Sequence, residues 1–172
     1  MALSELFFSC STSKSLALKT GDDVPLGTER GYHFMLPKMC PGPTRPLMYG
    51  DFGFAISPME DGIRLAHGVE LANLSASPNN GWIRRLLPHA KEMLPDLNIR
   101  EDSHWLGFRP TLPDSRPIIG QSTQFSDVYF AFGHQHYGMS LGPITGRIIS
   151  DLVARRDPHI DLTPFKPGRW TF

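Results

Sequence analysis

Residues 128–154 read VYFAFGHQHYGMSLGPITGRIISDLVA and carry the clearest structural signal in this 172-residue chain. The apolar run Val128–Phe132 predicts a buried strand. An aliphatic stripe at every fourth residue predicts a helix over about 141–154, and Pro143 is expected in its first turn, where proline is tolerated. The stripe consists of Ile144, Ile148 and Leu152. The segment therefore predicts a strand followed directly by a helix.

A turn bounded by Gly133 and Gly138 joins this strand to this helix. Glycine lets a backbone approach a ligand closely, and the start of a helix offers unpaired N–H groups at the positive end of its dipole. Such a turn suits a phosphate, a carboxylate or an electron-rich ring edge. The alternative is close packing of the helix on a sheet without any ligand, because Gly138, Gly142 and Gly146 leave one helix face bare.

The stretch WLGFRPTLPDSRPIIG at residues 105–120 contains a second chemical group of interest, the guanidinium of Arg109. The arginine lies within residues 95–117, which we expect to be rich in loops. Neighbouring prolines stiffen the backbone, so a fixed guanidinium could clamp a carboxylate through two hydrogen bonds. A structural ion pair, for instance with Asp114, is the alternative.

The middle of the chain has the pattern of an antiparallel sheet with a helix. Aromatic enrichment predicts a strand over 30–36, and an Asp-Gly turn between two apolar runs predicts a hairpin over 52–71. The prolines of 37–46 predict a loop. A helix is expected over about 80–94, with a kink at Pro88, because the proline ring clashes with the carbonyl four residues back.

Charge and composition exclude several classes of function. The 17 Lys and Arg residues balance 17 Asp and Glu residues, so the chain lacks the basic excess of a nucleic-acid-binding protein. No apolar run approaches the roughly 20 residues of a membrane helix, and no GxGxxG motif for binding a dinucleotide is present. His134 and His136 lack a third ligand at metal-binding spacing, so no metal site is expected. The serines lack a nucleophile elbow, which gives a hydrolase little support.

Three stretches together resemble the C-terminal half of D-amino-acid dehydrogenases: WLGFRPTLPDSRPIIG, VYFAFGHQHYGMSLGPITGRIISDLV and IDLTPF. These enzymes belong to the FAD-dependent oxidoreductase family that includes glycine oxidase and sarcosine oxidase. The similarity runs from about Asp23 to Phe165 and includes TERGYHFML and the hairpin DFGFAISPMEDGIRLAHGVELA. Its two-part signature, GFRP…DS.PIIG and AFGH…G…GP.TG, is specific to that family.

The resemblance implies a flavoenzyme that takes a hydride from the α-carbon of a D-amino acid. The product is an imino acid, which water hydrolyses to a 2-oxo acid and ammonia. Arg109 corresponds to the arginine that grips the substrate carboxylate, and His136 stands where a relative has a second substrate-contacting arginine. Tyr32 and Tyr49 are candidate walls of the substrate pocket, although aromatic residues at strand ends more often belong to a core.

The resemblance also implies that FAD is the cofactor and that the segment after the predicted strand wraps its ring system. The dipole of the following helix would stabilise the reduced flavin, in agreement with the interpretation of the turn as an anion-binding site. The residues expected to contact FAD are Gly133, His134, Gln135, His136, Tyr137, Gly138, Met139 and Ser140.

We therefore expect an α+β fold. A mostly antiparallel substrate-binding sheet would carry a packed helix, and a C-terminal strand and helix would form part of an incomplete, Rossmann-like FAD-binding domain. The expected parts are a remnant of an FAD-domain strand with a linker at 1–23, the substrate-binding domain at 24–104 and the flavin-contacting segment at 105–172. The segment Phe7–Thr12 lacks the alanine and glycine usual in the family.

The family's glycine-rich N-terminal half has no counterpart in this sequence, so the chain resembles a fragment or one half of a split enzyme. A partner would then supply the missing half. The alternative is a non-catalytic interaction module of the same fold that does not bind FAD alone. Two cysteines, Cys10 and Cys40, are too few for a disulfide framework and favour a cytoplasmic protein, with membrane association through its electron acceptor as a variant. Oxygen and a quinone are both candidates for that acceptor.

Overall fold

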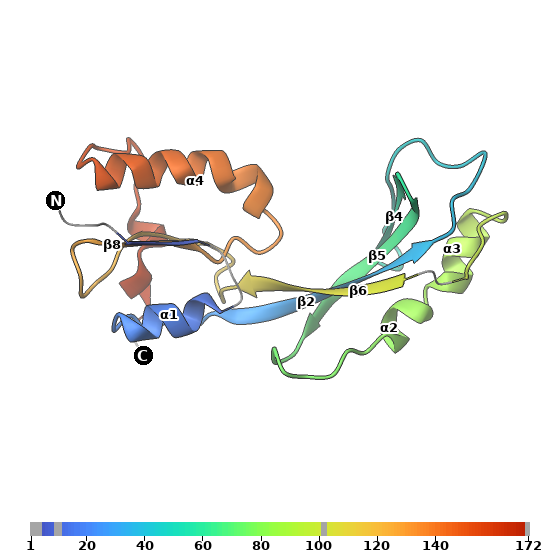
Figure 1. Ribbon diagram of the computed structural model, residues 1–172, viewed down its shortest axis with the longest axis horizontal. Helices are drawn as coiled ribbons and strands as arrows, with labels where there is room; N and C mark the ends of the chain where they lie inside the picture. Colours follow the sequence, from blue (N-terminus) through green and yellow to red (C-terminus); the bar gives the residue numbers. More distant parts are fainter. Residues whose placement is uncertain (1–4, 9–11, 101–102, 171–172) are drawn as a thin grey trace. The chain divides into compact units, whose positions relative to one another are not determined.

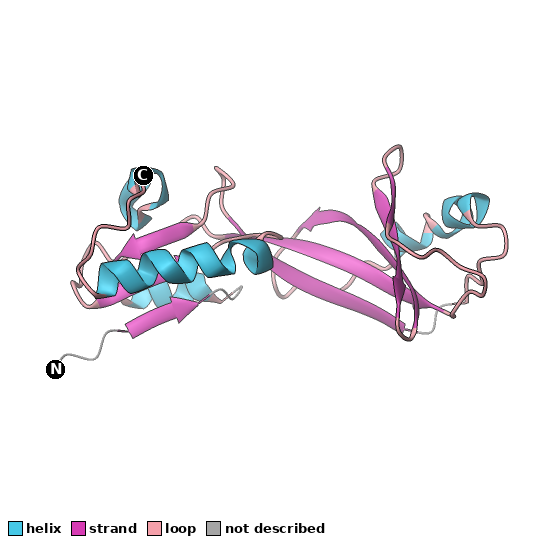
Figure 2. Cartoon of the chain, turned by 90° about the horizontal axis from the view of Figure 1, so that it is seen from above, coloured by secondary structure: helices cyan, strands magenta, loops and turns pink. Residues whose placement is uncertain are grey.

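The computed structural model describes residues 5–8, 12–100 and 103–170 and divides into two compact units. Residues 1–29 and 109–172 form the first unit, and residues 30–108 form the second. Each unit combines helices with a sheet, which confirms the α+β class (Figures 1 and 2).

The first unit is built on a three-stranded sheet in the order β1-β8-β7. Its strands are β1 (Glu5–Phe8), β7 (Ile118–Gln121) and β8 (Val128–Phe132), so the strand predicted at 128–132 is confirmed. β1 lies parallel to β8, whereas β7 pairs with β8 in the antiparallel direction. Residues 9–11, which include Cys10 and half of the segment Phe7–Thr12, lie outside the described ranges.

Helices cover both faces of this sheet (Figure 1). Helix α4 (Gly138–Val153) packs on the face where β8 places Tyr129, and helix α1 (Ser13–Lys19) packs on the face where β8 places Phe130. Because successive side chains of a strand point to opposite faces, the central strand β8 is buried on both sides. The chain continues beyond α4 into two short 3₁₀ helices, η1 (Thr163–Phe165) and η2 (Pro167–Arg169).

Helix α4 differs from its prediction in two respects. It begins at Gly138, so Pro143 lies inside the helix and not in its first turn. Pro143 offers no N–H to the carbonyl of Met139, but Met139 is 97% exposed, so water can bind that carbonyl instead. The buried stripe also runs through Ile148 but not through Ile144, which is half exposed. The packed face runs instead through Thr145, Ile148 and Ile149, and Ile144 lies at its margin.

The second unit contains a five-stranded sheet in the order β3-β4-β5-β2-β6. The hairpin predicted over 52–71 is confirmed, since β4 and β5 pair in antiparallel register from Phe54 opposite His67 to Met59 opposite Gly62. The strands are β2 (Gly27–Leu36), β3 (Leu47–Tyr49), β4 (Phe54–Met59), β5 (Gly62–Leu71) and β6 (Ser103–Thr111).

The single kinked helix expected over 80–94 is wrong, because this segment forms two helices. They are α2 (Gly81–Arg84) and α3 (Leu87–Met93). Pro88 stands in the first turn of α3, where an N–H would have no helical partner and its absence costs little. Proline therefore starts a new helix here and does not bend an existing one. Ile83 and Ala90 bury the inner faces of both helices in the core of this unit.

The interpretation of 95–117 as loop-rich is wrong for 103–111, which form strand β6, while 95–100 and 112–117 are loop and turn. Gly107 and Pro110 weaken the strand pattern of the sequence, yet β6 is an edge strand, where proline is tolerated. The strand at 30–36 and the loop at 37–46 are confirmed. Across the described ranges, every helix is too short or too polar to traverse a bilayer.

Candidate functional site

The turn between β8 and α4 is shaped by two residues in the left-handed region of backbone conformation. Gly133 has φ +85°, and a Cβ added there would lie 2.6 Å from Cδ1 of Leu112. Gln135 has φ 51°, which is uncommon for a residue with a side chain. For Gln135 this conformation costs free energy and persists where the surrounding contacts impose it. The turn is therefore a fixed structure.

Gln135 supplies the contacts that hold this turn. Its N–H donates to the carbonyl of Pro110 at 3.1 Å. Its side-chain Nε2 donates to Oγ1 of Thr111 at 2.7 Å and to Oγ of Ser115 at 3.3 Å. Pro110 directly follows Arg109, whose side chain is half-buried. The turn that carries the predicted flavin-contacting residues is thus bound to the backbone next to the predicted carboxylate anchor, all within the first unit.

His134 has a structural side chain. It is only 6% exposed, and its Nε2 lies 3.0 Å from Oγ1 of Thr145, which is buried in α4. Burial lowers the pKa of His134, so the imidazole is neutral at pH 7. Because the ring is buried and directed at the helix, the His134 side chain is not available to a ligand.

The first turn of α4 is open. Gly138, Met139 and Ser140 are exposed, and the N–H groups of these first helical residues have no partner inside the helix. Oγ of Ser140 donates to the carbonyl of Tyr137 at 3.1 Å, which fixes the start of the helix. The exposed rings of His136 and Tyr137 contact each other, with centroids 4.0 Å apart, beside this opening.

The glycine face of α4 does not pack on the sheet. A Cβ added at Gly142 or Gly146 would meet no atom within 4 Å, whereas Thr145 and Ile149 are buried. Close helix–sheet packing through the glycines, considered above as an alternative, is therefore wrong for Gly142 and Gly146. The open first turn and the bare face beside it fit a flat ring with a negatively charged edge, because the N–H groups and the helix dipole attract negative charge.

Asp114 pairs with Arg169 and not with Arg109, the partner considered in the sequence. Its carboxylate accepts hydrogen bonds from Nε of Arg169 at 2.8 Å and from Nη2 of Arg169 at 3.1 Å. Burial by itself would raise the pKa of Asp114, but the bonds from Arg169 and from the N–H of Arg116 outweigh it, so the pKa lies below its ordinary value. This ion pair fastens the C-terminal tail and leaves Arg109 outside it.

Tyr32 and Tyr49, the candidate walls of a substrate pocket, lie on different strands of the second unit. The hydroxyl of Tyr32 accepts hydrogen bonds from Nη2 of Arg30 at 2.9 Å and from the N–H of Asn79 at 3.1 Å, and donates to Oε2 of Glu70 at 2.5 Å. The ring of Tyr49 packs against the ring of Phe54, with their centroids 5.3 Å apart. Strands β4 and β5 separate the two tyrosines, a span of about 14 Å at usual strand spacing. The structure does not bring the tyrosines together.

The network around Tyr32 was not foreseeable from the sequence pattern. Arg30 is fully buried, and its Nε lies 3.2 Å from Oε2 of Glu70. Its Nη2 also donates to the carbonyl of Ser77 at 3.0 Å. Glu70 and Ser77 are far from Arg30 in the chain, so only the folded arrangement reveals these contacts. The network anchors the segment after β5 to the sheet.

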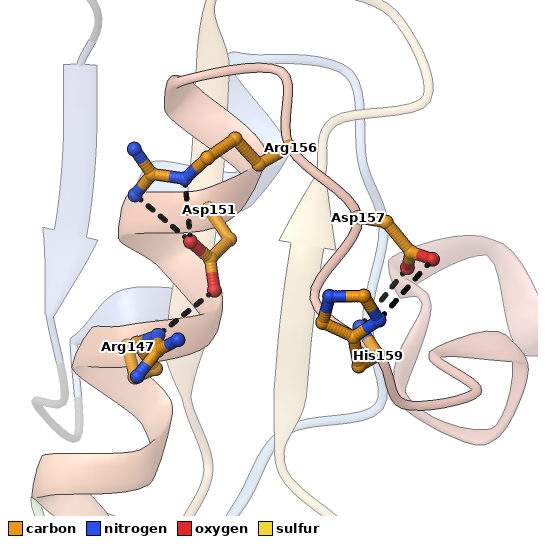
Figure 3. Close-up of polar contacts among 5 residues, drawn as sticks. All are labelled: Arg147, Asp151, Arg156, Asp157 and His159. Carbon is orange, nitrogen blue, oxygen red and sulfur yellow. Dashed lines mark hydrogen bonds and ion pairs between the residues drawn. The ribbon is translucent and has the colours of Figure 1, made fainter.

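A second charged cluster lies at the far end of α4 from the turn (Figure 3). Asp151 pairs with Arg147 at 3.1 Å and with Arg156 at 2.8 Å, and His159 lies 3.6 Å from Asp157. The hydrogen bond from Arg156 is the main cause that lowers the pKa of Asp151. These contacts hold the C-terminal end of the helix and the chain that follows it, and they leave the opening at Gly138 untouched.

Comparisons with known proteins show which family the sequence matches. Residues 10–152 match the family model described as FAD dependent oxidoreductase, DAO. A D-amino-acid oxidase from Bradyrhizobium diazoefficiens is 37% identical over 162 residues, which cover 92% of this chain and 38% of that protein. A glycine oxidase from Pseudomonas aeruginosa is 29% identical over 158 residues, which cover 91% of this chain and 43% of that protein.

The fold is shared with a solved structure as well. The crystal structure of glycine oxidase from Geobacillus kaustophilus superposes with a TM-score of 0.78 at 24% identity, and the match covers 91% of this chain and 43% of that one. The chain thus spans about two fifths of the length of the relatives it matches. The similarity includes both the turn at 133–138 and the stretch around Arg109.

Proposed function

Because this chain belongs to the FAD-dependent oxidoreductase family, we propose that it supplies the carboxylate anchor and the flavin-contacting turn of an enzyme that oxidises D-amino acids. The observation that supports this proposal most strongly is the hydrogen bond from the N–H of Gln135 to the carbonyl of Pro110. This bond ties the turn to the residue beside Arg109. The D-amino-acid class is taken from the relative named as a D-amino-acid oxidase.

In this proposal the backbone of residues 133–140 would hold FAD, and the N–H groups of Gly138, Met139 and Ser140 would stabilise the negative charge that the flavin ring gains on reduction. Bound FAD supplies the acceptor for the hydride that leaves the substrate α-carbon. Arg109 binds the substrate carboxylate through its planar fork of donors and so orients the α-carbon. His136 and Tyr137 lie exposed at the opening, where they can contact the substrate or exclude water from it.

We also propose that residues 24–104 form the substrate-binding part and that another polypeptide segment supplies the adenylate-binding half. Two observations support this second part. The sequence contains no GxGxxG motif, and the chain spans about two fifths of its relatives. Without that half, fewer contacts are available to FAD, so the chain alone should bind FAD more weakly than together with the dinucleotide-binding half of a relative.

Removal of the Arg109 guanidinium is the direct test. We expect Arg109→Ala to raise KM for D-alanine by a factor that corresponds to about 2–4 kcal/mol of lost binding, measured with FAD and the complementary half present. Arg109→Lys should recover part of this loss, because lysine keeps the charge but not the fork. Arg116→Ala, in an exposed side chain of the same stretch, is the control and should leave KM unchanged. An unchanged KM in Arg109→Ala would remove this residue from the proposed role.

The lack of a GxGxxG motif also favours a second candidate, a non-catalytic module that binds no flavin. Titration of FAD with the protein separates the two functions. Saturable quenching of flavin fluorescence, alone or with the complementary half, supports the oxidoreductase. A failure to quench under both conditions supports the module.

A further inference from the structure

Strands β2 and β6 are neighbours in the sheet, and two contacts fix how their residues pair. The rings of His33 and Trp105 stack with their centroids 5.0 Å apart. A Cβ added at Gly27 would lie 3.5 Å from Cγ2 of Thr111. Between these two contacts each strand advances by the same number of residues, in opposite directions along the chain. The pairing is therefore antiparallel, and the equal count leaves no room for a bulge between the contacts.

This register places Glu29 directly opposite Arg109, and both residues belong to the first unit. Residues two apart in a strand point to the same face, so Glu29 and Arg109 share a face with Thr111. The hydrogen bond from Oγ1 of Thr111 to Oε1 of Glu29, at 3.0 Å, agrees with this placement. The Cβ atoms of directly opposed residues are about 4.5–5.5 Å apart. A half-buried carboxylate and a half-buried guanidinium thus begin at neighbouring positions of one face.

The carboxylate of Glu29 is drawn along the strand, away from the position of Arg109. Its partner Thr111 stands two residues beyond Arg109, a distance of about 6.8 Å in a strand. Oγ1 of Thr111 accepts a hydrogen bond from Nε2 of Gln135 at 2.7 Å, which leaves the hydroxyl proton for Glu29. The second carboxylate oxygen, Oε2, accepts no hydrogen bond from the residues that the structure describes. Glu29 is therefore fixed through one oxygen and has the other available.

These two charges match the two ionised groups of an α-amino acid. At pH 7 such a molecule carries a carboxylate and an ammonium on the same carbon atom. The proposed function assigns the substrate carboxylate to Arg109, so the ammonium lies within a few ångströms of that guanidinium. Glu29 stands beside Arg109 with the complementary charge, and a hydrogen bond between an ammonium and a carboxylate is stronger than one between neutral groups.

We propose that Glu29 binds the substrate ammonium and makes the site selective for 2-amino acids over 2-hydroxy acids. This inference rests on the proposed function, because it requires Arg109 to hold the substrate carboxylate. A 2-hydroxy acid offers Arg109 the same carboxylate but offers Glu29 only a neutral hydroxyl, so it lacks the charge-assisted bond. Thr111 and Gln135 connect this ammonium site to the turn at 133–138, which places substrate recognition beside the flavin-contacting backbone.

The test compares D-alanine with D-lactate, which has the same carbon skeleton and carboxylate but a hydroxyl in place of the ammonium. Dissociation constants are measured by NMR titration of the full chain with the complementary half and pre-reduced FAD, which accepts no hydride, so neither ligand reacts. We expect the parent to bind D-alanine about tenfold more tightly than D-lactate or better.

Glu29→Gln keeps an oxygen for the Thr111 hydroxyl but loses the charge. It should weaken D-alanine binding about tenfold and change D-lactate binding by no more than about twofold. Asp127→Asn removes an exposed carboxylate of the same unit and is the matched control, which should change neither affinity.

Two results would overturn this inference and leave the proposed function intact. The first is a preference for D-alanine that is absent in the parent or unchanged in Glu29→Gln, while Arg109→Ala weakens both ligands. The second is an equal loss of both ligands in Glu29→Gln, which would show that Glu29 only positions the anchor or the turn. If neither ligand binds the parent, or if Arg109→Ala changes neither affinity, the carboxylate anchor itself is wrong and both proposals fail.

Discussion

The turn around Gln135 and the network around Tyr32 are both built from polar groups that join distant segments, but they differ in what remains available. Around Tyr32, the hydroxyl is saturated and Arg30 is fully buried, so that network is a scaffold. Around Gln135, the side chain is consumed by Thr111 and Ser115, while the neighbouring N–H groups at Gly138 stay exposed. The Arg30 guanidinium also has a nitrogen without a hydrogen-bond partner, Nη1, but it is buried, whereas the unpartnered groups at the turn belong to exposed residues. A polar cluster is available to a ligand only where its unpartnered groups are also exposed.

Removal of the Arg30 guanidinium should produce the largest loss of stability among these variants. Arg30→Met leaves Glu70 and the Tyr32 hydroxyl without their buried cation, and we expect a loss of about 3–5 kcal/mol in the free energy of unfolding, measured in urea. Arg45→Met changes an exposed arginine of the same unit and should stay within about 0.5 kcal/mol of the parent. A similar, small change in both variants would show that the network does not anchor the segment after β5.

Alanine substitutions at two glycines test the turn and the bare face of α4 separately. Gly133→Ala forces a side chain into a left-handed conformation and against Leu112, so it should cost about 2–3 kcal/mol of stability. Gly146→Ala places a methyl group in open space inside a helix and should raise stability by up to about 1 kcal/mol. Thermal unfolding and FAD titration measured together are the check. If the bare face receives the flavin, Gly146→Ala should weaken FAD binding although it stabilises the fold.

The smallest expected effect is on how the stability of the fold changes at acid pH. Burial holds the pKa of His134 below its ordinary value of 6.5, so the unfolded chain takes up a proton at a higher pH than the folded one. Stability should therefore fall as the pH drops below about 6.5 and should not depend on this group above it. NMR titration of the His134 ring reads the shift directly and separates it from His33, whose pKa is also lowered, mainly by burial. An unshifted His134 titration would contradict its buried contact with Thr145.

Local patterns account for what the sequence predicts well. Strand β8 is a continuous apolar run, and the β4–β5 hairpin is marked by its Asp-Gly turn, so neither depends on distant partners. The helices α2 and α3 were predicted as one because Pro88 has two outcomes, a kink or a new start, and periodicity does not distinguish them. Strand β6 was missed because its stability comes from pairing within the sheet, which overrides the glycine and proline in its own sequence.

In the candidate site, too, local patterns predict some features and distant contacts determine the others. Gly133 and Gly138 are visible in the sequence as the bounds of a turn, but the bond from Gln135 to Pro110 joins residues whose proximity no local pattern reveals. The pairing of Asp114 with Arg169, rather than with the nearby Arg109, has the same origin. Side-chain partners across long sequence separations are set by tertiary packing, so residue identity alone gives only candidates for them.

The first unit is assembled from segments that lie on either side of the second in the chain. Asp22, buried beside α1, accepts bonds from Ser122 and Thr123, and Ala17 of α1 shares a core with Phe130. During synthesis on a ribosome, α1 therefore emerges long before its partners, whereas residues 30–108 emerge as one continuous stretch. The second unit can fold while the chain is still growing, whereas the apolar side of α1 stays exposed until β7 and β8 have been synthesised.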